Sequence, residues 1–220
     1  MNIKGKKIVF LGDSITEGEG VSDPKEKTYW AVLGKLSGAI VKGYGIGGTR
    51  IAEQLVKTDA QEDTREFITR VDKMDTDADI VVIFGGTNDY GHGDAPLGKM
   101  SDRTNVTFYG AMHNLCQAAI KQYPHSIIVI ITPMHRLNEE QLINERGVRN
   151  VATLAEYVNA ERQVAEYYSL PLLDLYATGF LNPAVPKIQE LYMPDGLHPN
   201  DEGSELIARR LLGFLNSLMV

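Results

Sequence analysis

Cysteine is almost absent from this sequence: Cys116 is the only one among 220 residues. One cysteine can form neither an intramolecular disulfide nor a cysteine-based zinc site. Cys116 lies inside an amphipathic stretch, which predicts a small core residue. Because such cysteine usage is typical of a reducing compartment, we expect a cytoplasmic protein, with secretion as the alternative.

Long hydrophobic runs are also missing. The longest runs, residues 80–84 and 127–131, are far shorter than the roughly 18–20 apolar residues that a membrane-spanning helix needs. A basic start precedes a short apolar run at residues 8–11, but a signal peptide needs an apolar segment of roughly 7–15 residues. We therefore expect no membrane span and assign residues 8–11 to the first strand.

Positive charge is in deficit. The chain has 22 Lys and Arg against 29 Asp and Glu, a formal net charge of −7. No basic stripe is present, although binding to a nucleic-acid backbone requires one, so we expect no nucleic-acid partner. Hydrophobic residues make up an ordinary 43%, and no linker or repeat divides the chain. This composition predicts one domain over residues 1–220.

Short apolar runs alternate along the chain with longer amphipathic stretches. The runs are continuous and rich in β-branched residues, which is typical of strands buried on both faces; they cover residues 7–11, 39–44, 80–84, 127–131 and 170–175. Helical patterns lie between or after them, at residues 29–37, 61–73, 105–123, 148–168 and 202–219. This alternation predicts an α/β fold with a parallel sheet.

Polar and glycine-rich segments follow the predicted strands, at residues 12–14, 45–49, 85–89 and 132–133. Ligands of open α/β sheets bind beyond the carboxyl ends of the strands. These segments therefore indicate a site at that edge. Three longer predicted loops, at residues 90–103, 133–146 and 176–194, are expected to surround the site and select the substrate.

The first of these segments contains Ser14, in the sequence Gly-Asp-Ser-Ile-Thr-Glu-Gly. A serine at a strand-to-helix turn can present its hydroxyl over the edge of the sheet. The nearby helix N-terminus then favours negative charge at the same place. Taken alone, the segment is equally typical of a helix cap made by Asp13 or Ser14.

A second segment places Asp195 three residues before His198, ahead of the last predicted helix. The carboxylate can hold one ring nitrogen and leave the other to accept the proton of a serine hydroxyl. A capped helix entry, with His198 bonded to a carbonyl, explains the same residues.

Glycine-rich segments follow the second and third predicted strands, at residues 43–49 and 85–89. The Asn88 side chain and glycine N–H groups are suitable donors for the oxyanion of an acyl-transfer intermediate. Ordinary turn chemistry explains each segment on its own.

Taken in their order along the chain, these four segments resemble the SGNH hydrolases, also called the GDSL esterase and lipase family. The matching motifs are Gly-Asp-Ser at residues 12–14, the glycine-rich segment at residues 43–49, Gly-x-Asn-Asp at residues 86–89 and Asp-x-x-His at residues 195–198. The resemblance spans residues 8 to about 215. It implies a three-layer α/β/α sandwich around a flavodoxin-like parallel sheet of about five strands.

The resemblance also implies roles for the matching residues. Ser14 corresponds to the nucleophile, and His198 to the general base and later acid. Asp195 corresponds to the group that orients His198, and Asp13 to a residue that braces the site.

The oxyanion hole implied by the resemblance consists of the Ser14 N–H, the Gly48 N–H and the Asn88 side chain. The chain departs from the family pattern in the glycine-rich segment at residues 43–49. In the family this segment often carries an asparagine where Gly43 stands and a serine near Gly47. A glycine beside Gly48 is therefore an alternative donor.

The implied activity is serine-dependent hydrolysis of carboxylic esters through an acyl-serine, without a cofactor or metal. The loops that we expect at the substrate rim carry polar and aromatic side chains and no long apolar lid; their candidates are Tyr90, His92, His135 and Arg136. We therefore expect a small-molecule substrate with a short acyl group, such as an acetyl ester of a sugar or another polar alcohol. A lysophospholipase or thioesterase remains an alternative, as does a non-catalytic flavodoxin-like binding module.

Two other patterns are weaker. The spacing G-x-G-x-x-G occurs at Gly43, Gly45 and Gly48, but a dinucleotide site also needs an acidic residue at the end of the next strand, and Asp63 lies in a predicted helix. Alternating acidic residues imitate a calcium loop, at Asp75, Asp77 and Asp79. That pattern lacks the glycine at the sixth position and the glutamate at the twelfth, so we interpret it as a solvated turn.

Overall fold

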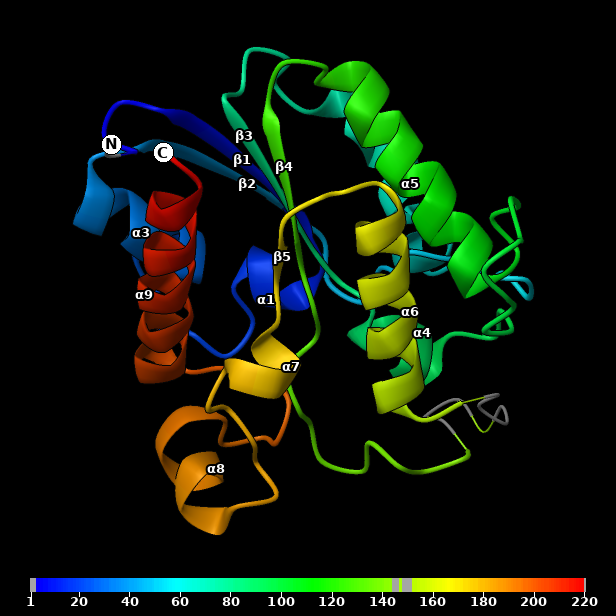
Figure 1. The fold of residues 1–220 in the computed structure, drawn as a ribbon. Helices are drawn as coiled ribbons and strands as arrows, with labels where there is room; N and C mark the ends of the chain where they lie inside the picture. The colour runs from blue at the N-terminus through cyan, green and yellow to red at the C-terminus, as the bar shows by residue number, and fades with distance from the viewer. Residues whose placement is uncertain (1–2, 144–146, 148–151, 220) are drawn as a thin grey trace.

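Five short segments pair side by side into one parallel sheet in the computed structural model, which describes residues 3–143, 147 and 152–219 (Figure 1). The strands are β1 (Lys7–Gly12), β2 (Ile40–Gly45), β3 (Ile80–Phe84), β4 (Ile127–Ile131) and β5 (Leu172–Leu173). Their order across the sheet is β2-β1-β3-β4-β5, and every neighbouring pair is parallel. The predicted α/β fold with a parallel sheet is confirmed.

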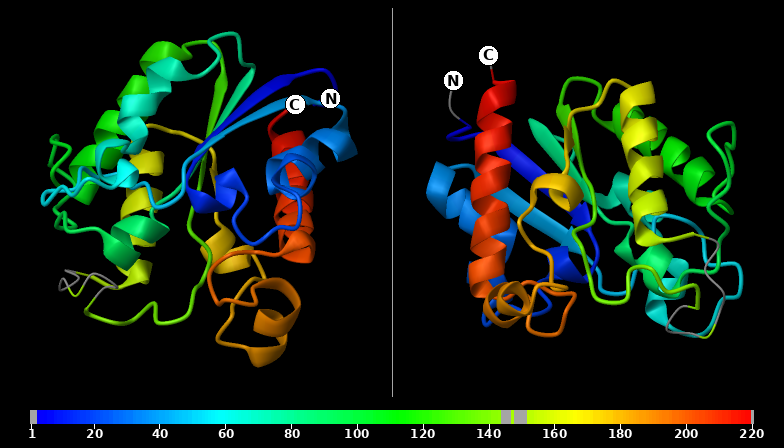
Figure 2. Two further views of the ribbon diagram at one scale, coloured as in Figure 1. Left: turned by 180° about the vertical axis from the view of Figure 1, so that it is seen from behind. Right: turned by 60° about the horizontal axis from the view of Figure 1, so that its bottom comes forward.

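Alternate residues of each central strand enter different hydrophobic cores. On β1, Ile8 and Phe10 pack into one core while Val9 and Leu11 pack into the other. Helices α3 (Tyr29–Ser37) and α9 (Asp201–Leu218) cover the first face, and α5 (Phe108–Gln122), α6 (Leu154–Tyr167) and the 3₁₀ segment η2 (Phe67–Lys73) cover the second (Figure 2). The continuous apolar runs therefore mark strands buried on both sides, which gives the predicted three-layer sandwich.

Shorter elements occupy the connections. They are α1 (Ser14–Glu17), α2 (Pro24–Lys27), η1 (Gln61–Thr64), α4 (Thr87–His92), α7 (Leu175–Thr178) and α8 (Pro186–Tyr192). Three of them overlap predicted loops: α4 extends into residues 90–103, and α7 and α8 fold much of residues 176–194. Among the helices of the described residues, none has both the length and the apolar character that crossing a membrane requires.

The predicted helix at residues 61–73 is wrong. The chain forms two 3₁₀ segments there, η1 and η2, separated by Arg65 and Glu66. The Phe67 N–H donates to the carbonyl of Arg50, 2.9 Å away, instead of to a preceding turn of helix. Long-range bonds of this kind outweigh the local helical pattern, which explains the error.

Other boundaries shift because capping residues set them. The predicted helix at residues 105–123 begins at Phe108, after Thr107 accepts a hydrogen bond from the Gly110 N–H. The predicted helix at residues 148–168 becomes α6, which follows a capping box made by Thr153 and Glu156; residues 148–151 lie outside the described residues. The predicted strand at residues 170–175 is only β5, because Asp174 caps α7.

The buried face of α6 contains a carboxyl group, that of Glu161, which is only 1% exposed. Within the described part of the chain, neither of its oxygens has a hydrogen-bond partner. It lies against Gly86, which begins the turn into α4. Burial raises the pKa of Glu161 well above its ordinary value, and repulsion from Asp89 and Asp13 adds to the shift. The fold therefore favours the neutral form of this residue over its charged form.

A neutral Glu161 makes stability depend on pH. Because its pKa is higher in the folded state than in the unfolded state, its contribution is complete below the ordinary glutamate pKa near 4.3 and is lost as the pH rises toward the folded value. Glu161→Gln keeps the shape without the titration. We expect its free energy of unfolding, relative to the wild type, to rise between pH 5 and pH 8 by up to about 1.4 kcal/mol per pH unit.

Urea denaturation at several pH values measures this difference. Glu166→Gln, on the exposed side of the same helix, is the matched control and should follow the wild type. A difference between Glu161→Gln and the wild type that stays constant with pH would contradict the prediction.

Candidate active site

Ser14 stands at the turn where β1 ends and α1 begins. Asp13 caps α1, and its carboxylate accepts a hydrogen bond of 3.1 Å from the Ile15 N–H. Gly12 is required because a Cβ there would collide with the Thr16 side chain. This tight turn holds Ser14, which is 8% exposed, at the carboxyl end of β1.

Burial raises the pKa of Asp13 to about 6, opposed by its hydrogen bond from Ile15 and by the nearby His198 and Arg70. Its carboxyl group is committed to the turn that carries Ser14. Such contacts brace the turn, since they fix the first residues of α1.

The turn before α9 holds Asp195 and His198. Asp195 Oδ1 accepts hydrogen bonds from the N–H groups of Leu197 and His198, at 2.8 and 2.7 Å. Gly196 adopts a left-handed conformation with φ of 81°, and its carbonyl accepts from the Leu137 N–H of the loop after β4. Burial opposes ionisation of Asp195, but the bonds from His198 and from these N–H groups prevail and lower its pKa. The carboxylate is therefore ionised and fixed beside the imidazole.

The three side chains converge although 184 positions separate Ser14 from His198. His198 Nδ1 lies 2.6 Å from Asp195 Oδ2, and His198 Nε2 lies 3.0 Å from Ser14 Oγ. Because an ionised carboxylate can only accept, Nδ1 carries the imidazole proton and Nε2 is left as an acceptor for the serine hydroxyl. This is the geometry in which a histidine can take a proton from a serine nucleophile.

The loop after β2 lies against Ser14. A Cβ on Gly47 would approach the Ser14 Cβ to 3.7 Å. The Gly47 N–H already donates to the Glu17 carboxylate, 2.7 Å away. Gly48 has a φ of +71°, a left-handed conformation that glycine adopts readily. Gly43, by contrast, lies inside β2.

The position of Gly43 accounts for the departure of this chain from the family pattern. A Cβ on Gly43 would meet the Trp30 ring at 2.5 Å, and the Trp30 indole N–H donates to the Thr16 carbonyl. The indole thus occupies the space that a larger side chain would need. The G-x-G-x-x-G spacing is divided between a strand and a loop and does not form a phosphate-binding turn.

The loop after β3 is bound to the loop after β2. Asn88 Nδ2 donates to the Thr49 carbonyl at 3.0 Å. The Asp89 carboxylate accepts from the N–H groups of Ile51 and Ala52, at 2.9 and 2.8 Å. Burial raises the pKa of Asp89 to about 7, while these two bonds act in the opposite direction. The two loops that carry Gly48 and Asn88 therefore form one hydrogen-bonded unit.

Two predicted rim residues on α4 make contacts inside the protein. Tyr90 is buried, and its hydroxyl donates to the carbonyl of Asn138. His92 is half-buried, and its Nδ1 accepts a hydrogen bond of 2.9 Å from Arg50. Arg50 also forms a fully buried ion pair with Asp63, the acidic residue noted in the weaker dinucleotide pattern.

The other two follow β4. His135 is half-buried, and its Nδ1 lies 2.9 Å from the Glu139 carboxylate. Its ring stacks on that of Tyr176, with 3.9 Å between the ring centroids. Arg136 is buried, and its guanidinium contacts the carbonyl of Thr87, next to Asn88. Within the described residues, no group of three or more His, Cys, Asp or Glu side chains is arranged to hold a metal ion.

Four residues that shape this edge have no role predicted from the sequence. Glu17 holds the glycine loop through Gly47, and Asp89 holds the backbone beyond Thr49. Arg50 and Arg70 bind carbonyl oxygens of the same loops. Glu17 and Asp89 do lie inside the motifs, but no spacing rule marks either arginine, because each meets partners that lie in other segments of the chain.

Comparison with known proteins supports the resemblance to the GDSL esterase and lipase family. The model of the GDSL-like lipase/acylhydrolase family matches residues 10–206. Among curated proteins, no sequence matches the chain.

Solved structures match over almost the whole chain. One crystal structure is 33% identical with a TM-score of 0.86 and covers 99% of both chains. A protein from Lactobacillus plantarum is 31% identical with a TM-score of 0.80, covering 97% of this chain and 98% of its own.

A member of the lipolytic protein G-D-S-L family from Veillonella parvula is similar in fold. It is 18% identical with a TM-score of 0.63, and the match covers 94% of this chain and 96% of that one. The family model spans the segments that contain Ser14, Gly48, Asn88 and His198. The chain belongs to the GDSL-like lipase/acylhydrolase family.

Proposed function

We propose that this protein hydrolyses carboxylic esters with Ser14 as the nucleophile, His198 as general base and acid, and Asp195 as the group that orients His198. The observation that carries the proposal is the unbroken hydrogen-bonded chain from Ser14 Oγ through His198 to Asp195, with distances of 3.0 and 2.6 Å. Membership of the acylhydrolase family supports it.

The first half of the reaction forms an acyl-serine. Ser14 Oγ bonds to the ester carbonyl carbon while His198 Nε2 takes the hydroxyl proton, and the carbonyl electron pair moves onto its oxygen. Asp195 stabilises the resulting imidazolium. When the tetrahedral intermediate collapses, the bond to the alcohol oxygen breaks and His198 returns the proton to that oxygen.

The second half releases the acid. A water molecule takes the place of the alcohol, and His198 Nε2 accepts one of its protons as the water oxygen bonds to the acyl carbon. Collapse of this second intermediate breaks the bond to Ser14 Oγ, which recovers the proton from His198.

The oxyanion is assigned to three donors: the N–H groups of Ser14 and Gly48 and the side chain of Asn88. The choice of Gly48 over its neighbour is supported by the Gly47 N–H, which is already bonded to Glu17. The close approach of this loop to Ser14 and the bond from Asn88 to Thr49 support the grouping.

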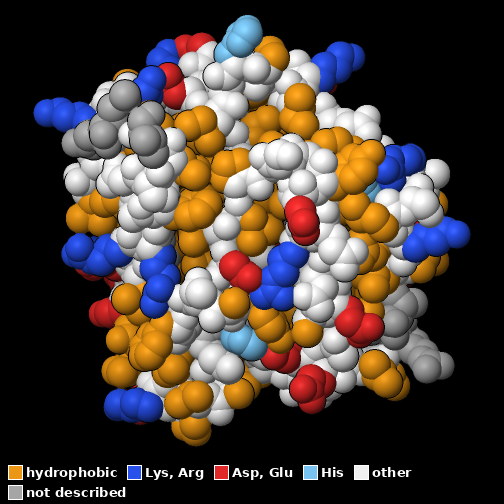
Figure 3. Space-filling model, viewed as in Figure 1, with side chains coloured by type: hydrophobic (Ala, Val, Ile, Leu, Met, Phe, Trp, Pro, Cys, Tyr) orange, Lys and Arg blue, Asp and Glu red, His pale blue; other side chains and the backbone are white. Residues whose placement is uncertain are grey.

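Short-acyl esters of a sugar or another polar alcohol are the proposed substrates. Polar side chains in the segments after β3 and β4 support this, since the Arg136 guanidinium donates to the Thr87 carbonyl, next to Asn88, and His135 pairs with Glu139. A second candidate is hydrolysis of longer acyl esters, as in a lysophospholipase or thioesterase. It is favoured by three exposed apolar side chains on or near α8, those of Phe180, Val185 and Leu191. Figure 3 shows that hydrophobic side chains are widespread on this face of the molecule.

Removal of the nucleophile or of the base tests the reaction. Ser14→Ala and His198→Ala should each lower the turnover of p-nitrophenyl acetate by at least about 10³-fold, because residues of such a unit act together. Circular dichroism should show both variants folded, and Ser217→Ala, on the last turn of α9, is the control with full activity. Full activity in Ser14→Ala would refute the assignment.

Loss of one oxyanion donor should affect chemistry more than binding. Asn88→Ala should lower kcat by about 10²–10³-fold with little change in KM, because the donor acts on charge that develops in the transition state. Asn216→Ala, an exposed position on α9, provides the comparison. A rise in KM at constant kcat would contradict this role for Asn88.

Acyl-chain length separates the two candidate substrate classes. The kcat/KM of p-nitrophenyl esters should be highest for acetyl and fall toward decanoyl if the acyl site is short. A steady rise from acetyl to decanoyl would instead favour the longer-acyl candidate, and Phe180→Ser should then reduce activity on the long esters selectively.

A further inference from the structure

The guanidinium of Arg70, in η2, joins three segments that carry parts of the candidate site. Its Nη1 donates to the carbonyls of Gly12 and Tyr44, at 3.1 and 2.7 Å. Its Nη2 donates to the Gly12 carbonyl and to Thr49 Oγ1, at 3.1 and 2.9 Å. One side chain thus connects the ends of β1 and β2 with the loop between Gly48 and Asn88.

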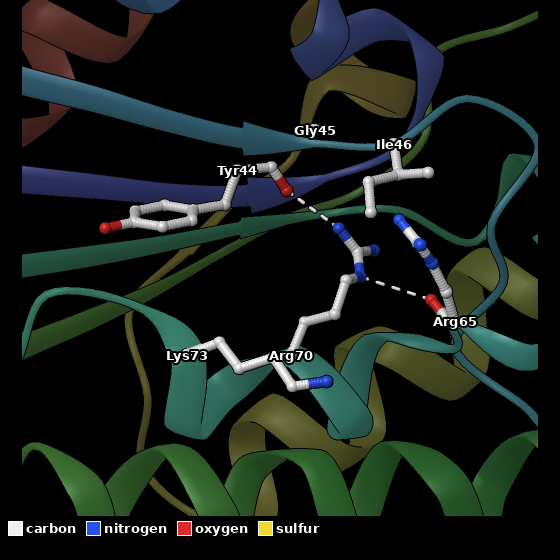
Figure 4. A pocket seen from close by; sticks show the side chains of 6 residues that line it. All are labelled: Tyr44, Gly45, Ile46, Arg65, Arg70 and Lys73. Atoms are coloured by element: carbon white, nitrogen blue, oxygen red, sulfur yellow. Dashed lines mark hydrogen bonds between the residues drawn. The ribbon is translucent and has the colours of Figure 1, made fainter.

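Every N–H of this guanidinium has an acceptor. Besides the four bonds above, Nε donates to the Arg65 carbonyl at 3.1 Å, and an arginine side chain has five N–H groups. Arg70 is only 6% exposed and forms a wall of a cavity of about 440 Å³ beside β2 (Figure 4). Burial lowers the pKa of Arg70 to about 10, opposed by Asp13, so the group stays charged at neutral pH.

The three acceptors stand next to the groups that the proposed reaction uses. Gly12 precedes Ser14 by two residues, and its carbonyl also accepts from the Ile46 N–H. Tyr44 lies near the end of β2, where the glycine loop departs. Thr49 follows Gly48, and its own carbonyl holds Asn88 Nδ2.

We propose that Arg70 is a positioning residue that fixes the nucleophile Ser14 relative to the oxyanion donors Gly48 and Asn88. The inference rests on the proposed function. Arg70 reaches none of the reacting atoms; it acts through the backbone of the two strand ends and through Thr49. Misaligned donors stabilise the transition state less, whereas they change the binding of the substrate little. The effect of losing Arg70 should therefore appear in kcat.

Arg70→Met and Arg70→Lys test this role. Met fills much of the same space without donors, and it should lower kcat for p-nitrophenyl acetate by about 10–100-fold while KM changes little. Lys keeps the charge and three donors, so its loss should be smaller than that of Met. A melting curve for each variant establishes that it is folded.

Arg65→Met is the matched control. Arg65 lines the same cavity, and its substitution removes the same charge but leaves the backbone carbonyl that accepts from Arg70 Nε. It should behave as the wild type. An equal loss of kcat in Arg65→Met and Arg70→Met would indicate a general charge effect and overturn the proposal, as would an unchanged kcat in Arg70→Met.

Hydrogen exchange provides a readout that does not depend on ester hydrolysis. Amides of residues 10–16 and 44–52 should exchange faster in Arg70→Met than in the wild type, and those of β4 should not. If Arg70→Met does not fold, the same comparison is decided on Arg70→Lys.

Failure of the proposed function and failure of the positioning role of Arg70 can be told apart. Equal, background turnover in the wild type and Ser14→Ala would defeat the proposed function, and the exchange data alone would then decide whether Arg70 holds these segments together. Unchanged exchange in both segments would overturn the positioning role.

Discussion

The register of β1 between its two neighbours is the constraint on which the rest of this edge depends. Gly12 pairs with Gly45 on one side and with Phe84 on the other, so three strands end on one line. The chain leaves that line three times, toward Ser14, Gly48 and Asn88. A slip of one residue would turn every side chain of β1 to the wrong core and displace Ser14 from the two loops. The ladders of β1 with both neighbours and the fit of its side chains in the two cores oppose such a slip.

The two halves of the candidate site are built differently. The loops that carry Gly48 and Asn88 are bound to each other through Asn88 and Asp89, and they are buried over residues 49–52 and 87–91, while Gly48 itself is half-buried. The Asp195 side chain, by contrast, is 54% exposed and belongs to a turn that rests on a few backbone bonds. In the proposed reaction, the hydrogen-bonded half would receive the developing charge, and the more solvated half would move protons. In that reaction, preorganisation matters most for the half with Gly48 and Asn88, because donors that are already oriented need no reorganisation as the charge develops.

The sequence is most informative where one local pattern determines the structure. Residues 80–84 are apolar without interruption, and they form a strand buried on both faces. Ser14 and His198 could be singled out because short motifs surround them. Residues 61–73 have a helical pattern, but the bond from Phe67 to Arg50 and the reach of Arg70 toward Gly12 impose 3₁₀ turns. Tyr90 was expected at the rim and is buried, since its hydroxyl finds a carbonyl acceptor at Asn138. Contacts between distant segments decide these cases, and no local pattern contains them.

The separation of 184 positions between Ser14 and His198 also has a consequence during synthesis. A nascent chain can complete β1, β3 and both glycine-containing loops while the turn before α9 has not yet been made. Bringing such distant positions together is entropically costly and belongs to the late steps of folding. If the proposed roles hold, Ser14 therefore remains without its general base, His198, until nearly the whole chain has emerged and packed. Partly made or truncated chains would be inert toward esters in the cell, and turnover would report on the integrity of the entire fold.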